Sequence, residues 1–87
     1  MYVILVYDIN VKRVGKMLKL NRKYLHWIQN SVFEGEITEV KLKELIEKAK
    51  LIMNTKEDSV IIFKSREKRW LDKEIIGLEK NDTDNFL

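Results

Sequence analysis

The sequence predicts a single α+β domain in which two amphipathic helices alternate with apolar strands. Three observations carry this prediction. The chain has 87 residues, of which 45% are hydrophobic, so it can build one core. Two stretches repeat apolar residues with the spacing of a helix, and two short apolar runs have the composition of β-strands. No glycine-rich turn of the dinucleotide-binding type accompanies them.

The first strand is expected at residues 2–7, which are apolar on both faces, as in a central strand. Asp8 closes it, and Asn10 can cap a helix that begins at Val11. At about 100° per residue, one side of this helix carries the apolar and core-facing residues Val14, Met17, Leu18, Asn21, Tyr24 and Leu25. The other side carries Lys12, Lys16, Lys19 and Lys23.

Residues 26–37 alternate roughly between apolar and polar side chains, which predicts a bent strand or a very short hairpin with breaks at Asn30 and Gly35. Thr38 is expected to cap a second helix that runs to about Met53. The buried stripe of this helix comprises Leu42, Leu45, Ile46, Ala49 and Met53. A further strand is expected at residues 58–64 and a weaker one at 74–78.

This order, βαββαβ with an additional C-terminal strand, predicts a ferredoxin-like sandwich with both helices on one face of the sheet. Residues 1–80 form one domain in this interpretation, and residues 81–87 form a flexible tail. A monomer of this length buries only about 60% of its surface, so we expect a homodimer.

Composition excludes several classes of protein. The chain has no cysteine, so neither disulfides nor a thiolate metal site is expected. Its first apolar run lacks the flanks of a signal peptide, and no stretch approaches the roughly 20 apolar residues of a membrane span. We therefore expect a cytoplasmic protein with no membrane partner.

Charge is distributed unevenly along the chain. The net charge is only +3, but between Asp8 and Glu34 there is no acidic residue. The interval contains Lys12, Arg13, Lys16, Lys19, Arg22, Lys23 and His26. Cations on successive turns of a helix can follow the phosphates of a nucleic acid without reading bases, and the alternative is an ordinary solvated helix face.

Asp8 is the candidate for chemistry, because it follows a buried strand and precedes the cationic helix. Mg²⁺ often binds only one or two protein carboxylates and fills its other positions with water and phosphate oxygens. Two copies of Asp8 across a dimer axis would form a better site. The alternative is a turn or capping aspartate, and spacing alone does not separate the two.

Three stretches together resemble the CRISPR-associated endoribonuclease family, the small adaptation proteins that partner the CRISPR integrase. They are VYDI at 6–9, QNSVFEG at 29–35 and DSVIIF at 58–63. The spacing of the intervening elements is similar as well, so the resemblance covers nearly the whole chain. One departure is Trp27, where relatives commonly have a basic residue, so the backbone contact of that residue is not expected here.

The resemblance implies a ferredoxin-like homodimer in which two copies of Asp8 face each other and share Mg²⁺ or Mn²⁺. It also implies that Tyr7 and Asn10 neighbour this ligand, that Ser31 and Phe33 lie beside the site, and that Arg13 contacts a phosphate. The segment at 74–78 would add a strand to the partner subunit.

Two functional hypotheses follow. In the first, the chain is a metal-dependent nuclease of CRISPR adaptation, an antiviral defence, and cleaves single-stranded RNA or double-stranded DNA through paired Asp8 residues. In the second, it is a non-catalytic scaffold that holds DNA within a heterohexamer-type assembly with the integrase. A small-molecule regulatory module on the same fold ranks third, because the three glycines are scattered.

Overall fold

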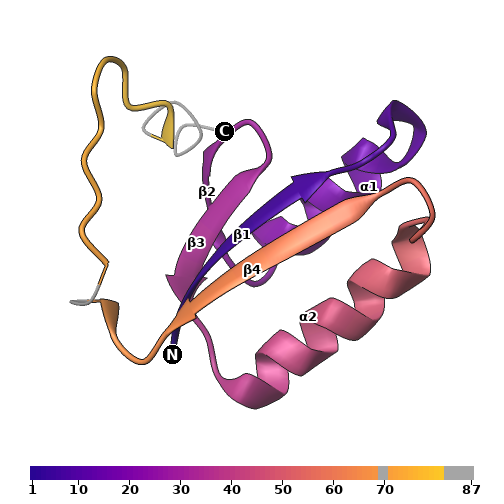
Figure 1. Ribbon diagram of the computed structural model, residues 1–87, viewed down its shortest axis with the longest axis horizontal. Coiled ribbons are helices and arrows are strands. Elements are labelled where there is room, and N and C mark those ends of the chain that lie inside the picture. Colours follow the sequence, from indigo (N-terminus) through magenta and orange to yellow (C-terminus); the bar gives the residue numbers. More distant parts are fainter. Residues whose placement is uncertain (69–70, 82–87) are drawn as a thin grey trace.

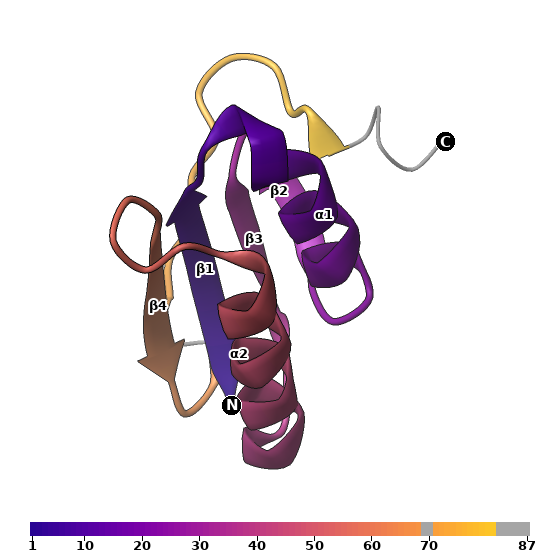
Figure 2. The same ribbon diagram turned by 90° about the vertical axis from the view of Figure 1, so that its right-hand side faces the viewer.

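A computed structural model describes residues 1–68 and 71–81. Its elements are β1 (Tyr2–Asp8), α1 (Val11–Arg22), β2 (His26–Gln29), β3 (Val32–Glu36), α2 (Glu39–Ile52) and β4 (Ser59–Ser65). The strands form one antiparallel sheet in the order β2-β3-β1-β4. Both helices cover the same face of this sheet (Figures 1 and 2). The predicted α+β, ferredoxin-like fold is thereby confirmed.

Both helices begin where capping chemistry predicts. The side chain of Asn10 accepts a hydrogen bond of 2.9 Å from the Lys12 backbone N–H, and Thr38 accepts one of 3.1 Å from Lys41. These bonds satisfy backbone donors that have no partner inside the helix. Neither helix is long and apolar enough to cross a membrane, and no other helix within the described ranges is either.

Residues 26–37 form a hairpin rather than one bent strand. Its turn contains Asn30, whose φ of 46° is a left-handed conformation that asparagine tolerates, and the Trp27 indole N–H donates to the Asn30 carbonyl at 3.0 Å. The predicted break at Gly35 is wrong, because Gly35 lies inside β3. A Cβ atom there would lie 3.3 Å from Leu25 Cδ2, so glycine permits the close approach of Leu25.

The core lies between the sheet and the helices. Its fully buried members include Val3 and Leu5 of β1, Phe33 of β3, Met17 of α1 and Leu45 of α2. Side chains alternate along a strand, so Val3, Leu5 and Tyr7 point towards the helices, and Tyr2, Ile4, Val6 and Asp8 lie on the other face.

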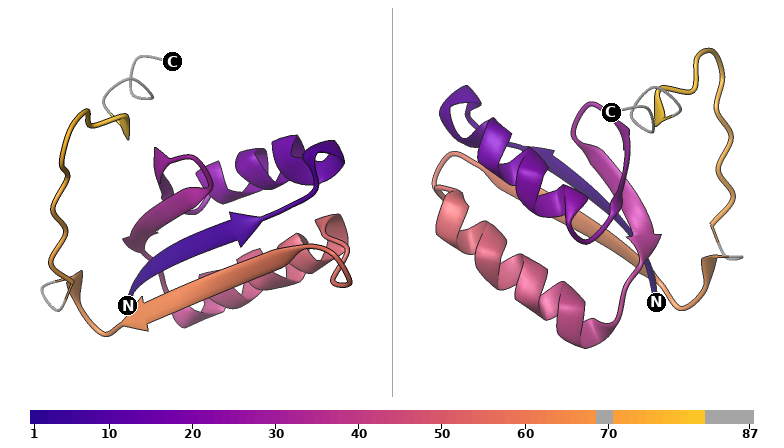
Figure 3. Two further views of the ribbon diagram at one scale, coloured as in Figure 1. Left: turned by 45° about the horizontal axis from the view of Figure 1, so that its top comes forward. Right: turned by 180° about the vertical axis from the view of Figure 1, so that it is seen from behind.

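The other face of the sheet, here called the helix-free face, has no layer of helices over it (Figure 3). On β4, Ile61 and Phe63 remain 52% and 56% exposed. They pair in register with Val6 and Ile4 of β1, both of which are half-buried. The helix-free face is therefore apolar along its centre.

The strand predicted at residues 74–78 is not present in the chain. Residues 71–80 form no strand and run beside the sheet without joining it (Figure 1). Ile76 and Leu78 of this stretch are 92% and 74% exposed. Of the tail predicted at residues 81–87, residues 82–87 lie outside the described ranges.

Candidate functional site

Asp8 is the last residue of β1 and lies opposite Ser59 of β4. Its side chain is exposed, and its carboxylate has no hydrogen-bond or ion-pair partner within residues 1–68 and 71–81. Strand alternation puts it on the helix-free face, in line with Ile4 and Val6. Asp8 is thus an available acidic group at the end of an apolar surface.

Of the residues predicted beside Asp8, Tyr7 and Phe33 lie in the core on the helix side of the sheet, whereas the Asp8 side chain is exposed. The backbone N–H of Tyr7 donates to the Ser31 carbonyl at 3.1 Å, which ties the end of β1 to the turn between β2 and β3. The rings of Tyr7 and Phe33 stack at 6.1 Å beneath the strand, and burial raises the pKa of the Tyr7 hydroxyl. Tyr7 and Phe33 therefore support the strand end from inside the core.

Asp58, which sequence reasoning quoted only as part of a motif, is buried next to this strand end. Its side chain is 0% exposed. Its carboxylate accepts 2.8 Å hydrogen bonds from the backbone N–H groups of Asn10 and Asn54. It also faces the guanidinium of Arg13, whose hydrogen bonds hold the pKa of Asp58 well below its usual range in spite of burial.

Arg13 does not have the position expected of a phosphate contact. Its Nε lies 2.7 Å from Asp58 Oδ2, its Nη2 lies 3.2 Å from Asp58 Oδ1, and the same Nη2 also contacts Glu57. Two carboxylates therefore engage Nε and Nη2, and only 23% of the side chain is exposed. These contacts give Arg13 a structural role, and its predicted contact with a phosphate stays a prediction.

The four lysines predicted to bind nucleic acid differ from Arg13 in having no carboxylate partner within the described part of the chain. Lys12, Lys16, Lys19 and Lys23 are all exposed, and none has an ion-pair partner within the described part of the chain. The first turn of α1 contains no acidic residue. These four lysines, here called the lysine stripe, form a cationic surface along α1 and its C-cap residue Lys23, and their binding to nucleic acid stays a prediction.

Potential metal ligands are not clustered in the described part of a single chain. Among residues 1–68 and 71–81, no three His, Cys, Asp or Glu side chains are grouped so that they could hold an ion. The exposed, unpartnered carboxylate of Asp8 suits a hard cation such as Mg²⁺ or Mn²⁺, which accepts one or two carboxylates together with water. The residues present fit such an ion if a second copy supplies a second carboxylate.

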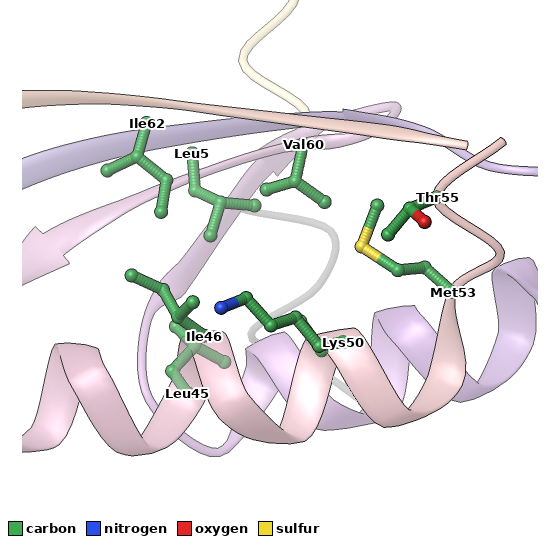
Figure 4. A pocket seen from close by; sticks show the side chains of 9 residues that line it. Leu5, Leu45, Ile46, Lys50, Met53, Thr55, Val60 and Ile62 are labelled. Carbon is green, nitrogen blue, oxygen red and sulfur yellow. The ribbon is translucent and has the colours of Figure 1, made fainter. Parts of the chain in front are cut away.

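An apolar cavity of about 230 Å³ lies between α2 and the sheet (Figure 4). It is lined by Leu5, Leu45, Ile46, Ala49, Lys50, Met53, Thr55, Val60 and Ile62. Lys50 is its one charged lining residue. The cavity is on the helix side of the sheet, whereas Asp8 is on the helix-free face, so it adds no group to the site.

A second polar cluster on the helix-free face also went unpredicted. Glu34 of β3 is 8% exposed and forms an ion pair with Lys73, which precedes the extended residues 74–78. Burial and then hydrogen bonding to Glu34 raise the pKa of Tyr2 to about 12. Nothing in the sequence connected Glu34 to Lys73, because 39 positions separate them.

The fold and site together define a small ferredoxin-like domain that presents one strand-end aspartate beside a cationic helix. The sequence model of one family, described as CRISPR associated protein Cas2, matches residues 1–73. The chain therefore belongs to the CRISPR-associated Cas2 family. Its sequence is 49% identical to a protein of Dictyoglomus turgidum, over 100% of both chains, and 47% identical to one of Fusobacterium nucleatum, over 100% of this chain and 87% of the other. Both relatives are named CRISPR-associated endoribonuclease Cas2.

Solved structures agree with this assignment. A crystal structure described as cas2 superposes with a TM-score of 0.85 at 46% identity, covering 92% of this chain and 90% of that one. Cas2 from Streptococcus pyogenes superposes with a TM-score of 0.79 at 28% identity, covering 88% of this chain and all of the other. Both superpositions support the ferredoxin-like fold of this chain.

Proposed function

We propose that this chain is a metal-dependent endonuclease of CRISPR adaptation that cleaves phosphodiester bonds of single-stranded RNA or double-stranded DNA, with Asp8 paired across a homodimer. The observation that carries the proposal is the exposed, unpartnered carboxylate of Asp8 at the end of β1. The name endoribonuclease, given to relatives that match the full length of the chain, supports a nuclease role.

A second copy of the chain is the proposed cover of the helix-free face. The exposed side chains of Ile61 and Phe63 would lose their contact with water in such a dimer. A two-fold axis brings the same residue of both copies together when that residue lies near the axis. Asp8 lies on this face, at one end of its apolar centre, so a two-fold axis near that end would bring the two carboxylates together.

Paired Asp8 carboxylates would hold Mg²⁺ or Mn²⁺. A bound divalent ion would activate water and offset charge on the scissile phosphate. The chain's own contribution is to present the carboxylate oxygens at a rigid strand end and to hold the nucleic-acid backbone on the lysine stripe. Because neither task reads bases, the site would select a phosphodiester backbone rather than a sequence.

A non-catalytic scaffold is the second candidate. It is favoured by the exposure of the lysine stripe, which can hold a nucleic-acid backbone without any catalytic group. In this role the homodimer would bind duplex DNA and dock the CRISPR integrase in a heterohexamer-type assembly. Asp8 would then be dispensable.

The test compares the purified wild-type chain with Asp8→Ala on labelled RNA and duplex DNA in Mg²⁺ or Mn²⁺. Glu47→Gln is a control that removes one exposed negative charge from α2, on the other side of the sheet. The nuclease proposal expects cleavage by wild type and by Glu47→Gln only, and none in a chelator. Equal cleavage by all three proteins, or by none, would favour the scaffold.

A further inference from the structure

We propose that Asp58 is a positioning residue for Asp8, and that it acts through the Asn10 backbone N–H and the Arg13 guanidinium. This inference deepens the proposed nuclease function and rests on it. It concerns groups that touch neither substrate nor metal. They fix the backbone from which the Asp8 side chain projects.

The first step is the position of Asp58 in the sheet. Asp8 pairs in register with Ser59, and Asp58 is the residue immediately before Ser59. Its carboxylate reaches across to the Asn10 N–H, two residues beyond Asp8, at 2.8 Å. Asp58 therefore clamps the chain directly after Asp8 to the connection that leads into β4.

The second step is the reach of Arg13 back to the same carboxylate. Arg13 lies in the first turn of α1, and it approaches Asp58 with both Nε and Nη2, at 2.7 and 3.2 Å. A two-point guanidinium–carboxylate contact fixes orientation as well as distance. The start of α1 is thereby held in one orientation relative to the end of β1.

The third step is that the Asp58 carboxylate and the N–H groups around it, here called the clamp, satisfy one another's hydrogen bonds. The Asp58 carboxylate receives N–H groups from Asn10, Asn54 and Arg13, and its side chain is fully buried. Removing an acceptor from such a cluster leaves buried donors without partners, which favours a local shift of the backbone. The backbone donors that would lose their partner are the N–H of Asn10, between Asp8 and α1, and the N–H of Asn54, before β4.

The rest of the fold has independent support. β1 is paired on both sides, with β3 and β4, and α1 has its own N-cap in the Asn10 side chain. Loss of the clamp would therefore displace the β1–α1 connection and leave the sheet in place. A displacement of about 1 Å at a reacting group can cost about 100-fold in rate.

The test uses Asp58→Asn and Arg13→Lys, with Glu47→Gln as the charge control. Single-turnover cleavage at saturating RNA or duplex DNA separates rate from binding, and a titration gives the dissociation constant. We expect cleavage to fall about 10- to 100-fold in both variants, with the dissociation constant changed less than about twofold. The control should cleave at the wild-type rate.

A second measurement needs no activity. Amide hydrogen exchange followed by NMR reports the Asn10 N–H, which the clamp protects. In Asp58→Asn, this amide should exchange faster than in wild type, and the amide of Leu5 in the centre of β1 should keep its rate. Loss of protection at both amides would mean general unfolding and would overturn a local positioning role.

The remaining outcomes separate this inference from the proposed function. Wild-type cleavage by Asp58→Asn and Arg13→Lys, with an inactive Asp8→Ala, would overturn the positioning role alone. Weaker binding and a smaller salt dependence for Arg13→Lys, with an unchanged rate at saturation, would make Arg13 a phosphate contact and would also overturn it. Wild-type cleavage by Asp8→Ala would remove both proposals.

Discussion

Arg13 and Asp58 are 45 positions apart in the chain and are joined at two points, Nε to Oδ2 at 2.7 Å and Nη2 to Oδ1 at 3.2 Å. Their contact connects the first turn of α1 to the residue before β4. It also removes the guanidinium from the surface of a helix whose other cations face solvent. The acidic partner of this helix is therefore distant in sequence and close in space.

The Arg13–Asp58 pair predicts that the thermal stability of the protein decreases at acidic pH. Hydrogen bonds from Arg13 lower the pKa of Asp58, so the ionised carboxylate stabilises the fold above the unfolded pKa of about 4. That stability is lost as the pH falls through the lower, folded value. Wild type should lose thermal stability steeply below about pH 4, whereas Asp58→Asn should melt lower at pH 7 and change less with acid. Parallel melting curves from pH 7 to pH 2 would contradict this account.

A pair of leucines on α2 tests the core. Leu45 is 0% exposed, and Leu51 of the same helix is 86% exposed. Leu45→Ala should lower the free energy of unfolding by about 2–5 kcal/mol, because it leaves a cavity. Leu51→Ala should change it by less than about 0.5 kcal/mol. Denaturant unfolding of both variants gives the comparison, and similar losses would mean that Leu45 is not part of the core.

The sequence predicts those parts of the fold that depend on neighbouring residues. Asn10 and Thr38 cap the two helices as expected, because a cap bonds an N–H only a few positions away. The helix stripes and the apolar β1 likewise follow from local periodicity. Leu20 is an exception, since it is buried although it was not assigned to the stripe of α1.

Contacts between residues far apart in the sequence could not be predicted from local sequence patterns. Arg13 counted as one of several exposed cations until the fold brought Asp58 against it. Residues 74–78 have the composition of a strand, but a strand also needs hydrogen bonds to a neighbouring strand, and local composition does not determine whether these form. The position of Asp8 at the end of β1 could be predicted, because a strand end beside a cationic helix is visible in the sequence itself.

The lysine stripe predicts salt-dependent binding of nucleic acid. Replacing Lys12, Lys16, Lys19 and Lys23 with glutamine should greatly weaken binding to duplex DNA at low salt. The slope of log affinity against log salt should shrink by about 0.9 for each lost phosphate contact. A matched control replaces the exposed lysines of α2, which are Lys41, Lys43, Lys48 and Lys50. Equal losses of DNA affinity in the two variants would mean that binding depends on the net charge of the protein and not on the position of the lysine stripe.

The ion pair between Lys73 and Glu34 predicts that Lys73 holds residues 71–80 against β3. Lys73→Gln removes the cation that holds this segment to β3, so limited proteolysis within residues 71–80 should be faster than in wild type. Lys80→Gln removes a cation from an exposed position and should leave that rate unchanged. Equal digestion of wild type and Lys73→Gln would show that other contacts hold the segment.

The central claim is that Asp8 acts as a pair across a dimer. Its most direct test is a heterodimer of one wild-type copy and one Asp8→Ala copy, isolated through two different tags and assayed for metal-dependent cleavage beside both homodimers. Paired action predicts that the heterodimer keeps no more than about a tenth of wild-type activity. Retention of about half would mean that each Asp8 works alone and would contradict the paired site.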